Sequence, residues 1–164
     1  MLDEVWVTIH DFPNYKISSS GRVANAKTGN ILKESLTKHG VVKIGLVHEG
    51  VQYTRSMSVL VAEMFVDGKT DLFNTPVHLD GNHLNNRSDN LVWRPRWFAW
   101  KYSRQFNELE PGQNRGPIID LKSGDVYKDM VSVATHNGLL ISDIWKSVYT
   151  KKETFPTWQL FELV

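Results

Sequence analysis

Residues Val77–Trp93 read VHLDGNHLNNRSDNLVW and form the most informative stretch of the chain. The stretch is dense in Asn and Asp, whose side chains bond nearby backbone groups and therefore favour turns. This composition predicts a compact, loop-rich unit. The chain contains no Cys, so any bound metal would need His, Asp, Glu or Asn as its ligands.

The stretch resembles the HNH nuclease motif of phage and intron homing endonucleases. The heart of that motif reads His-x-Asp-Gly-Asn-x-x-Asn-Asn, three further residues and Asn-Leu-x-Trp, and every fixed position is matched between His78 and Trp93. Residues 6–23 and 60–65 are similar to the small module that commonly precedes the motif. Residues 117–150 look like the repeat that supplies a C-terminal helix-turn-helix in these enzymes. Together the three resemblances cover nearly the whole chain.

The resemblance implies a hairpin and a helix that grip one divalent ion, Mg²⁺ or Mn²⁺. In the family, a His on the first strand takes a proton from the water that attacks the scissile phosphate, and His78 occupies this position. An Asn on the second strand holds the loop and orients the His, and Asn90 matches it. The resemblance therefore makes His78 and Asn90 the candidate catalytic residues.

The chain departs from the family pattern at both metal-ligand positions. These positions are the residue before the catalytic His and the residue nine places after the strand Asn, which here are Val77 and Ala99. Neither side chain has the oxygen or imidazole lone pair that a hard cation requires. No cofactor is therefore certain, and we expect DNA nicking to be impaired. Asp80 and His83 are the alternative ligands for a rebuilt metal site.

Positive charge is concentrated in the middle of the chain, although the net charge is only +1. Residues 87–106 hold five Lys or Arg against one Asp, and we expect a helix over residues 94–106. In HNH proteins the helix after the motif lies along the backbone of the cut strand, so these cations are candidates for phosphate contacts. The candidates are Arg87, Arg94, Arg96, Lys101 and Arg104. The alternative is a solvated amphipathic helix whose aromatic residues lie in the core. We expect Trp97 and Trp100 to be core residues, and their alternative role is to wedge into a minor groove of DNA.

The C-terminal segment is predicted to form two strands and then a helix-turn-helix. Ser132 and Ser142 are expected to cap two short helices, which Gly138 separates. The second helix and the Lys pair after it would contact DNA. The candidate residues are Ser142, Lys146, Ser147, Lys151 and Lys152. The alternative is a helical pair that only packs against the rest of the chain.

These segments predict an α+β protein that is elongated and modular. It would have a small β-rich N-terminal module, a ββα-metal (HNH-like) unit and a C-terminal ββ plus helix-turn-helix module. The predicted boundaries are 1–66 for the nuclease-associated module, 67–106 for the HNH-like unit with its basic aromatic helix, 107–117 for a linker, and 118–164 for the helix-turn-helix module. Within the first module, residues 12–15 are predicted to be a turn. Two alternating runs, 41–48 and 51–57, predict a hairpin that turns at Glu49-Gly50, and the apolar run 59–65 predicts a helix.

Composition limits the class of protein. Of the 164 residues 41% are apolar, which is ample for packed cores and excludes disorder as the main state. No apolar run approaches the roughly 18 residues of a membrane span, and the N-terminus lacks the layout of a signal peptide. We therefore expect a cytoplasmic protein, in the host cytoplasm if phage-encoded, that has no membrane partner.

The partner that these observations favour is double-stranded DNA. Two other functions stay open at this point. One is an active, divalent-metal-dependent HNH endonuclease that uses other ligands. The other is a nuclease scaffold repurposed to bind a host or phage protein.

Overall fold

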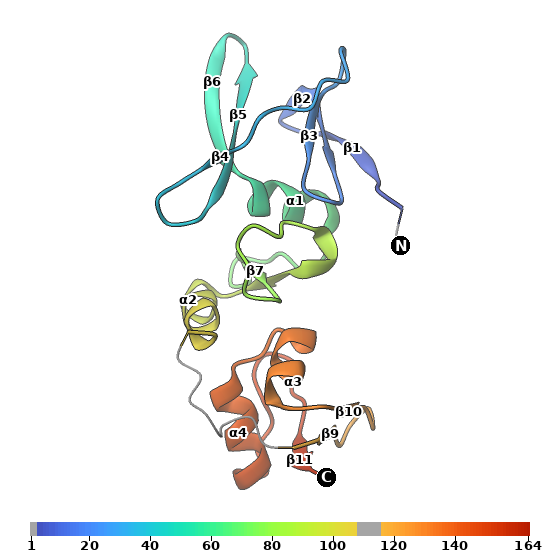
Figure 1. The fold of residues 1–164 in the computed structure, drawn as a ribbon, viewed down its shortest axis with the longest axis vertical. Helices are drawn as coiled ribbons and strands as arrows, with labels where there is room; N and C mark the ends of the chain where they lie inside the picture. Colours follow the sequence, from blue (N-terminus) through green and yellow to red (C-terminus); the bar gives the residue numbers. More distant parts are fainter. Residues whose placement is uncertain (1–2, 108–115) are drawn as a thin grey trace. The chain divides into compact units, whose positions relative to one another are not determined.

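The computed structural model describes residues 3–107 and 116–164. Within these ranges the chain forms two compact units, one of residues up to 78 with 82–96, the other of residues 79–81 with 97–164. Each unit combines helices with small antiparallel sheets, which confirms the α+β class (Figure 1). The predicted linker 107–117 falls mostly outside the described residues, and the predicted module boundaries stay a prediction.

The first unit begins with two three-stranded antiparallel sheets, β1-β2-β3 and β4-β5-β6. Their strands are β1 (Trp6–Ile9), β2 (Phe12–Ser18), β3 (Val23–Asn25), β4 (Ser35–Leu36), β5 (Val42–His48) and β6 (Val51–Ser56). Burial alternates along β5, so that Val42, Ile44 and Leu46 enter the core. Glu49 and Gly50 both have positive φ and form the tight hairpin turn predicted at this point.

The prediction of a turn at residues 12–15 is wrong, because these residues begin strand β2. Phe12 pairs with Ile9 and is buried in the core, so the turn lies just before it. Pro13 lies where the β1–β2 register shifts, and it has no paired partner on β1 or on β3. Its missing N–H therefore breaks no ladder hydrogen bond.

A helix and a hairpin complete the first unit. Helix α1 (Met57–Phe65) agrees with the predicted helix, and its buried residues join one core with both sheets. The hairpin pairs β7 (Thr75–His78) with β8 (Leu91–Arg94). Trp93 on β8 is 2% exposed and its Nε1 donates to the carbonyl oxygen of Val66, 2.9 Å away. Trp93 therefore anchors the hairpin to the rest of the unit.

In its described residues, the second unit contains a small sheet of order β10-β9-β11 and three helices. Its elements are α2 (Arg96–Gln105), β9 (Ile118–Asp120), β10 (Val126–Tyr127), α3 (Met130–Asn137), α4 (Ile141–Thr150) and β11 (Phe161–Leu163). Gly138 ends α3 with a φ of 62°, which confirms the predicted turn between the two helices. None of the helices that the structure describes combines the length and the apolar composition that a membrane span requires.

Both predicted helix caps differ from the structure. Asp129 caps α3, and its side chain accepts from the backbone N–H of Ser132, 2.7 Å away. Helix α4 begins at Ile141 after Leu140, so Ser142 lies inside its first turn. Ser132 lies three residues after the true cap, and it was predicted because Ser suits this position as well as Asp does. The residue before α4 is Leu140, whose side chain forms no capping hydrogen bond, so no cap residue marks this helix start.

Candidate functional site

The hairpin places the candidate general base at the end of a strand. His78 is the last residue of β7 and pairs with Leu91, the first residue of β8. Between them runs a long polar loop that ends in a short 3-10 helix, Ser88–Asn90. The loop returns onto the strand end, so that His78 is only 7% exposed.

His78 is held by an amide that the sequence analysis did not single out. Its Nε2 lies 3.0 Å from Oδ1 of Asn86, a residue that is 6% exposed. The Asn86 amide nitrogen faces the carbonyl oxygens of His83 and Leu84, 3.4 Å from each, which fixes the orientation of the amide. The Asn-Asn pair in the motif was the available signal, because Asn86 occupies one of its fixed positions.

Asn90 holds the loop from its other end. Its side-chain Nδ2 donates to the carbonyl oxygen of Asn85, 2.8 Å away, and the residue is 9% exposed. This contact fits the loop-holding role expected of it. A second imidazole, that of the exposed His83, has its ring centroid 5.1 Å from that of His78.

The two ligand positions do not fit a hard divalent cation. Val77 is buried in β7 opposite Val92, and Ala99 is a half-buried residue of α2. Their hydrocarbon side chains have no lone pair to donate. Across residues 3–107 and 116–164, no group of three or more His, Asp or Glu residues could hold a metal ion. The exposed Asp80 and His83 therefore belong to no such group.

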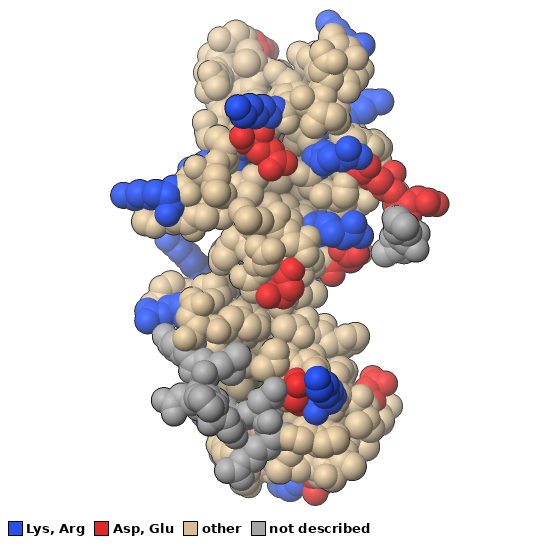
Figure 2. Space-filling model, in the orientation of Figure 1, with Lys and Arg blue, Asp and Glu red and all other residues tan. Residues whose placement is uncertain are grey.

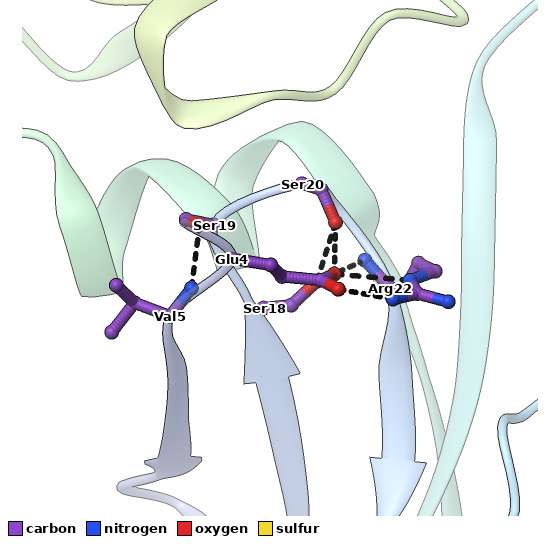
Figure 3. Close-up of polar contacts among 6 residues, drawn as sticks. All are labelled: Glu4, Val5, Ser18, Ser19, Ser20 and Arg22. Carbon is purple, nitrogen blue, oxygen red and sulfur yellow. Dashed lines mark hydrogen bonds and ion pairs between the residues drawn. The ribbon is translucent and has the colours of Figure 1, made fainter. Parts of the chain in front are cut away.

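The turn between β2 and β3 is ordered by a small polar network (Figure 3). The Glu4 carboxylate accepts hydrogen bonds from the Arg22 guanidinium and from the Ser20 hydroxyl. These contacts, that with Arg22 first, lower the pKa of Glu4 from 4.5 to about 2. The Ser19 hydroxyl accepts from the backbone N–H of Val5, 3.0 Å away. The turn is thus tied to the start of β1.

The basic residues near the hairpin differ in their access to solvent. Arg87 is exposed and forms two hydrogen bonds with Asp89, of 2.9 and 3.1 Å, and these lower the pKa of Asp89. Arg94 is 7% exposed and its Nη1 donates to the carbonyl oxygen of Trp93. Arg96 is exposed. Arg87 and Arg96 are therefore the better placed of these three for phosphate contacts.

Helix α2 carries its cations over exposed indole rings. Lys101 Nζ lies 5.5 Å from the Trp97 ring centroid, and the Arg104 guanidinium lies 4.6 Å from that of Trp100. The expectation that both Trp side chains are core residues is wrong, because they are 51% and 60% exposed. The core face of α2 is formed by Phe98 and Tyr102, which leave the indoles on the outer face.

Polar contacts fix α2 against the helix-turn-helix. The Tyr102 hydroxyl lies 2.7 Å from the carbonyl oxygen of Leu79 and 3.1 Å from that of Ala134, and it can donate to either. The Gln105 amide donates to the Leu139 carbonyl and accepts from the Ile141 N–H, at 3.3 and 2.9 Å. The position of α2 relative to α4 is therefore set by specific hydrogen bonds.

A groove between α2 and α4 brings together several predicted DNA-contacting residues. Lys101 and Arg104 from α2 line it with Ser142 and Lys146 from α4, beside the indoles of Trp100 and Trp145. Lys146 also pairs with Asp143, 3.2 Å away. Cations that are distant in sequence thus share one surface hollow.

The remaining predicted contacts of the C-terminal module divide in two. Lys151 and Lys152 are exposed, and Lys151 pairs with Glu162 at 3.2 Å. Ser147 is 1% exposed and its hydroxyl accepts from the Phe161 N–H, which ties α4 to β11. Its hydroxyl therefore faces the interior, and we leave Ser147 out of the DNA-facing set.

Charges of both signs are mixed on the surface. On the face drawn in Figure 2, Lys and Arg side chains alternate with Asp and Glu and form no continuous basic area. The net charge of +1 agrees with this mixture. Attraction to a polyanion would therefore depend on local groups of cations such as the α2–α4 groove.

Comparison with known proteins supports the resemblance seen in the motif. Residues 4–47 match the family model described as the NUMOD4 motif. The chain is 38% identical over 132 residues to the DNA endonuclease I-HmuI of Bacillus phage SP01, covering 73% of this chain and 72% of that protein. It is 40% identical over 88 residues, 54% of this chain, to an uncharacterized HNH endonuclease of Acanthamoeba polyphaga mimivirus, and spans about a quarter (26%) of its length.

A solved structure shows the same similarity in three dimensions. It is that of the HNH homing endonuclease I-HmuI, from work on DNA binding and cleavage by that enzyme. The TM-score is 0.58 at 25% identity, and the match covers 96% of this chain and 97% of the other. Sequence and fold therefore agree on one similarity.

Proposed function

Because the chain belongs to the HNH homing endonuclease family, we propose that it binds double-stranded DNA and that its capacity to nick DNA is impaired. The observation that carries the second part is the presence of Val77 and Ala99 at the ligand positions. In the family mechanism the divalent ion supplies several kcal/mol of transition-state stabilisation. Each loss of about 1.4 kcal/mol slows the reaction tenfold. Without an ion, His78 would have to act as a base without the Lewis acid that stabilises the leaving oxygen.

The DNA-binding part of the proposal is supported by the cations of the second unit. Lys101, Arg104 and Lys146 meet in the α2–α4 groove, where each could displace a counterion from a phosphate. Ser142 adds a hydroxyl that can donate to a phosphate oxygen or a base edge. None of these contacts requires a metal, so binding would survive the loss of catalysis.

One observation favours a second candidate function, an active nuclease with a rebuilt site. The rings of His78 and His83 lie 5.1 Å apart, and imidazole pairs suit transition-metal ions better than Mg²⁺. Asp80 is the other substitute ligand that the sequence offers, although the described residues contain no group of three His, Asp or Glu that could hold a metal ion. This candidate predicts nicking that depends on His83 and Asp80, which the first does not.

The DNA-binding proposal is tested by fluorescence anisotropy of a labelled duplex between about 50 and 200 mM salt. The three groove cations alone predict a log-log slope of about −3, which any phosphate contacts of Arg87 and Arg96 would steepen, and Lys101→Ala or Arg104→Ala should each reduce its magnitude by about 1. Lys38→Ala, which removes an exposed cation from the first unit, is the matched control and should leave the slope unchanged. A slope near zero would contradict DNA binding and point to the repurposed scaffold that binds a protein.

A further inference from the structure

We propose that Asn86 is a positioning residue that keeps the proton of His78 on Nε2, and that the Ser18–Arg22 turn holds Asn86 in place. The proposal takes from the proposed function only the assignment of His78 as the candidate base. It gives the N-terminal module, which includes the segment matched by the NUMOD4 motif, a part in building the site.

The first step is the hydrogen bond between the two side chains. An amide oxygen can only accept, so the 3.0 Å contact between Asn86 Oδ1 and His78 Nε2 requires a proton on Nε2. In the neutral imidazole the lone pair then resides on Nδ1.

The second step is the orientation of the amide. Turning the Asn86 amide by 180° would place its N–H groups toward Nε2 and its oxygen toward the carbonyl oxygens of His83 and Leu84. Two carbonyl oxygens facing a third acceptor repel one another, so the observed orientation is the favoured one. Because Asn86 is buried, water is poorly placed to replace either contact.

The third step is the close approach of the turn to the Asn86 backbone. Gly21 has a φ of 83°, and a Cβ built on it would lie 2.9 Å from the carbonyl oxygen of Asn86 and 3.1 Å from its Cβ. The Ser88 N–H, two residues after Asn86 in the loop, donates to the carbonyl oxygen of Ser19 in the turn, 2.8 Å away. The loop segment that carries Asn86 therefore rests directly on the turn.

The opposite side of the turn is fixed by the Glu4 network drawn in Figure 3. Arg22 and Ser20 bind the Glu4 carboxylate, and the Ser18 hydroxyl accepts from the Arg22 N–H, 3.0 Å away. Contacts therefore run without a break from Glu4 through the turn to Asn86 and His78. All of these residues belong to the first unit.

The test reads the tautomer of His78 by two-bond ¹H–¹⁵N correlation spectra of the full chain, without DNA or metal. Spectra are recorded at about pH 8, where imidazoles are ordinarily neutral. The His78 signals are those missing from His78→Phe. We expect an unprotonated Nδ1 in the wild type and loss of this preference in Asn86→Ala. Asn86→Asp, whose carboxylate also accepts, should retain it, and the exposed control Asn30→Ala should change nothing.

Two results would overturn the proposal. One is a wild-type His78 that carries its proton on Nδ1, and the other is a folded Asn86→Ala variant with unchanged tautomer populations. If Asn86→Ala does not fold, the wild-type spectrum and Asn86→Asp decide the matter, since loss of the Nε2–H tautomer in Asn86→Asp also refutes it. Loss of DNA binding in the anisotropy experiment would leave these spectra unaffected, so the two failures are distinguishable.

Discussion

Replacement of Gly21 by Ala tests how closely the Ser18–Arg22 turn packs against the loop that carries Asn86, through its effect on the free energy of unfolding. At the observed φ of 83° a side chain costs about 1–2 kcal/mol in backbone strain. The new Cβ would also lie 2.9 Å from the Asn86 carbonyl oxygen, and displacing packed backbone costs about 1–3 kcal/mol more. The sum predicts a loss of about 2–5 kcal/mol in the free energy of unfolding.

Gly29→Ala is the matched control for this substitution. Gly29 has a similar φ of 73°, but a Cβ built there meets no atom within 4 Å. It should therefore lose only the backbone contribution of about 1–2 kcal/mol. The free energies of unfolding of the two variants are compared by urea titration. If the dependence on urea concentration is the same in both, their difference cancels the backbone contribution and leaves that of the contact with Asn86.

The difference between the two variants is the quantity to compare. We expect Gly21→Ala to be less stable than Gly29→Ala by about 1–3 kcal/mol. Gly21→Ala should also disturb the His78 tautomer, whereas Gly29→Ala should not. Equal losses of stability in the two variants would refute the close packing of the turn against Asn86.

Three further predictions concern pH, packing and catalysis. The pKa of Glu4 is lowered from 4.5 to about 2, so the contacts of its ionised carboxylate stabilise the fold fully above pH 4.5. This stabilisation is lost as the pH falls toward 2, and the Tm difference between wild type and Glu4→Gln should shrink over the same range. Trp93→Ala should lower the free energy of unfolding, measured in urea titrations, by about 3–5 kcal/mol, because a buried indole and its hydrogen bond to a carbonyl are lost. A loss below about 1 kcal/mol would contradict the anchoring role of Trp93. Val77→Asp combined with Ala99→Asn should create metal-dependent nicking of supercoiled DNA, and adding His78→Ala should abolish it; nicking by the triple variant would contradict the assignment of the base.

The sequence was most informative where chemistry and local structure coincide. The fixed residues of the motif predicted a loop-rich unit around His78, and Gly138 predicted the break between α3 and α4. Alternating apolar residues predicted the β5–β6 hairpin, and an apolar run that contains Ala62-Glu63 predicted helix α1. In each case the residues that decide the local structure are close in sequence, so a pattern in the sequence predicts it.

The features that escaped prediction depend on distant partners. Strand β11 pairs with β9 across some forty residues, so nothing local marks Phe161 as part of a sheet. The indoles of Trp97 and Trp100 are outside because Phe98 and Tyr102 occupy the core face, which requires knowledge of what α2 packs against. Asn86 was missed because its partner His78 and its support Gly21 become neighbours only in the folded unit.

Mn²⁺ titration followed by electron paramagnetic resonance tests the proposed loss of the family's metal site without any assay of DNA cleavage. The measurement needs no knowledge of the DNA target. The wild type should leave the free Mn²⁺ signal unchanged, while Val77→Asp with Ala99→Asn should reduce it by binding the ion. Stoichiometric Mn²⁺ binding by the wild type that is lost in His83→Ala or Asp80→Ala would show instead that the chain holds a rebuilt metal site.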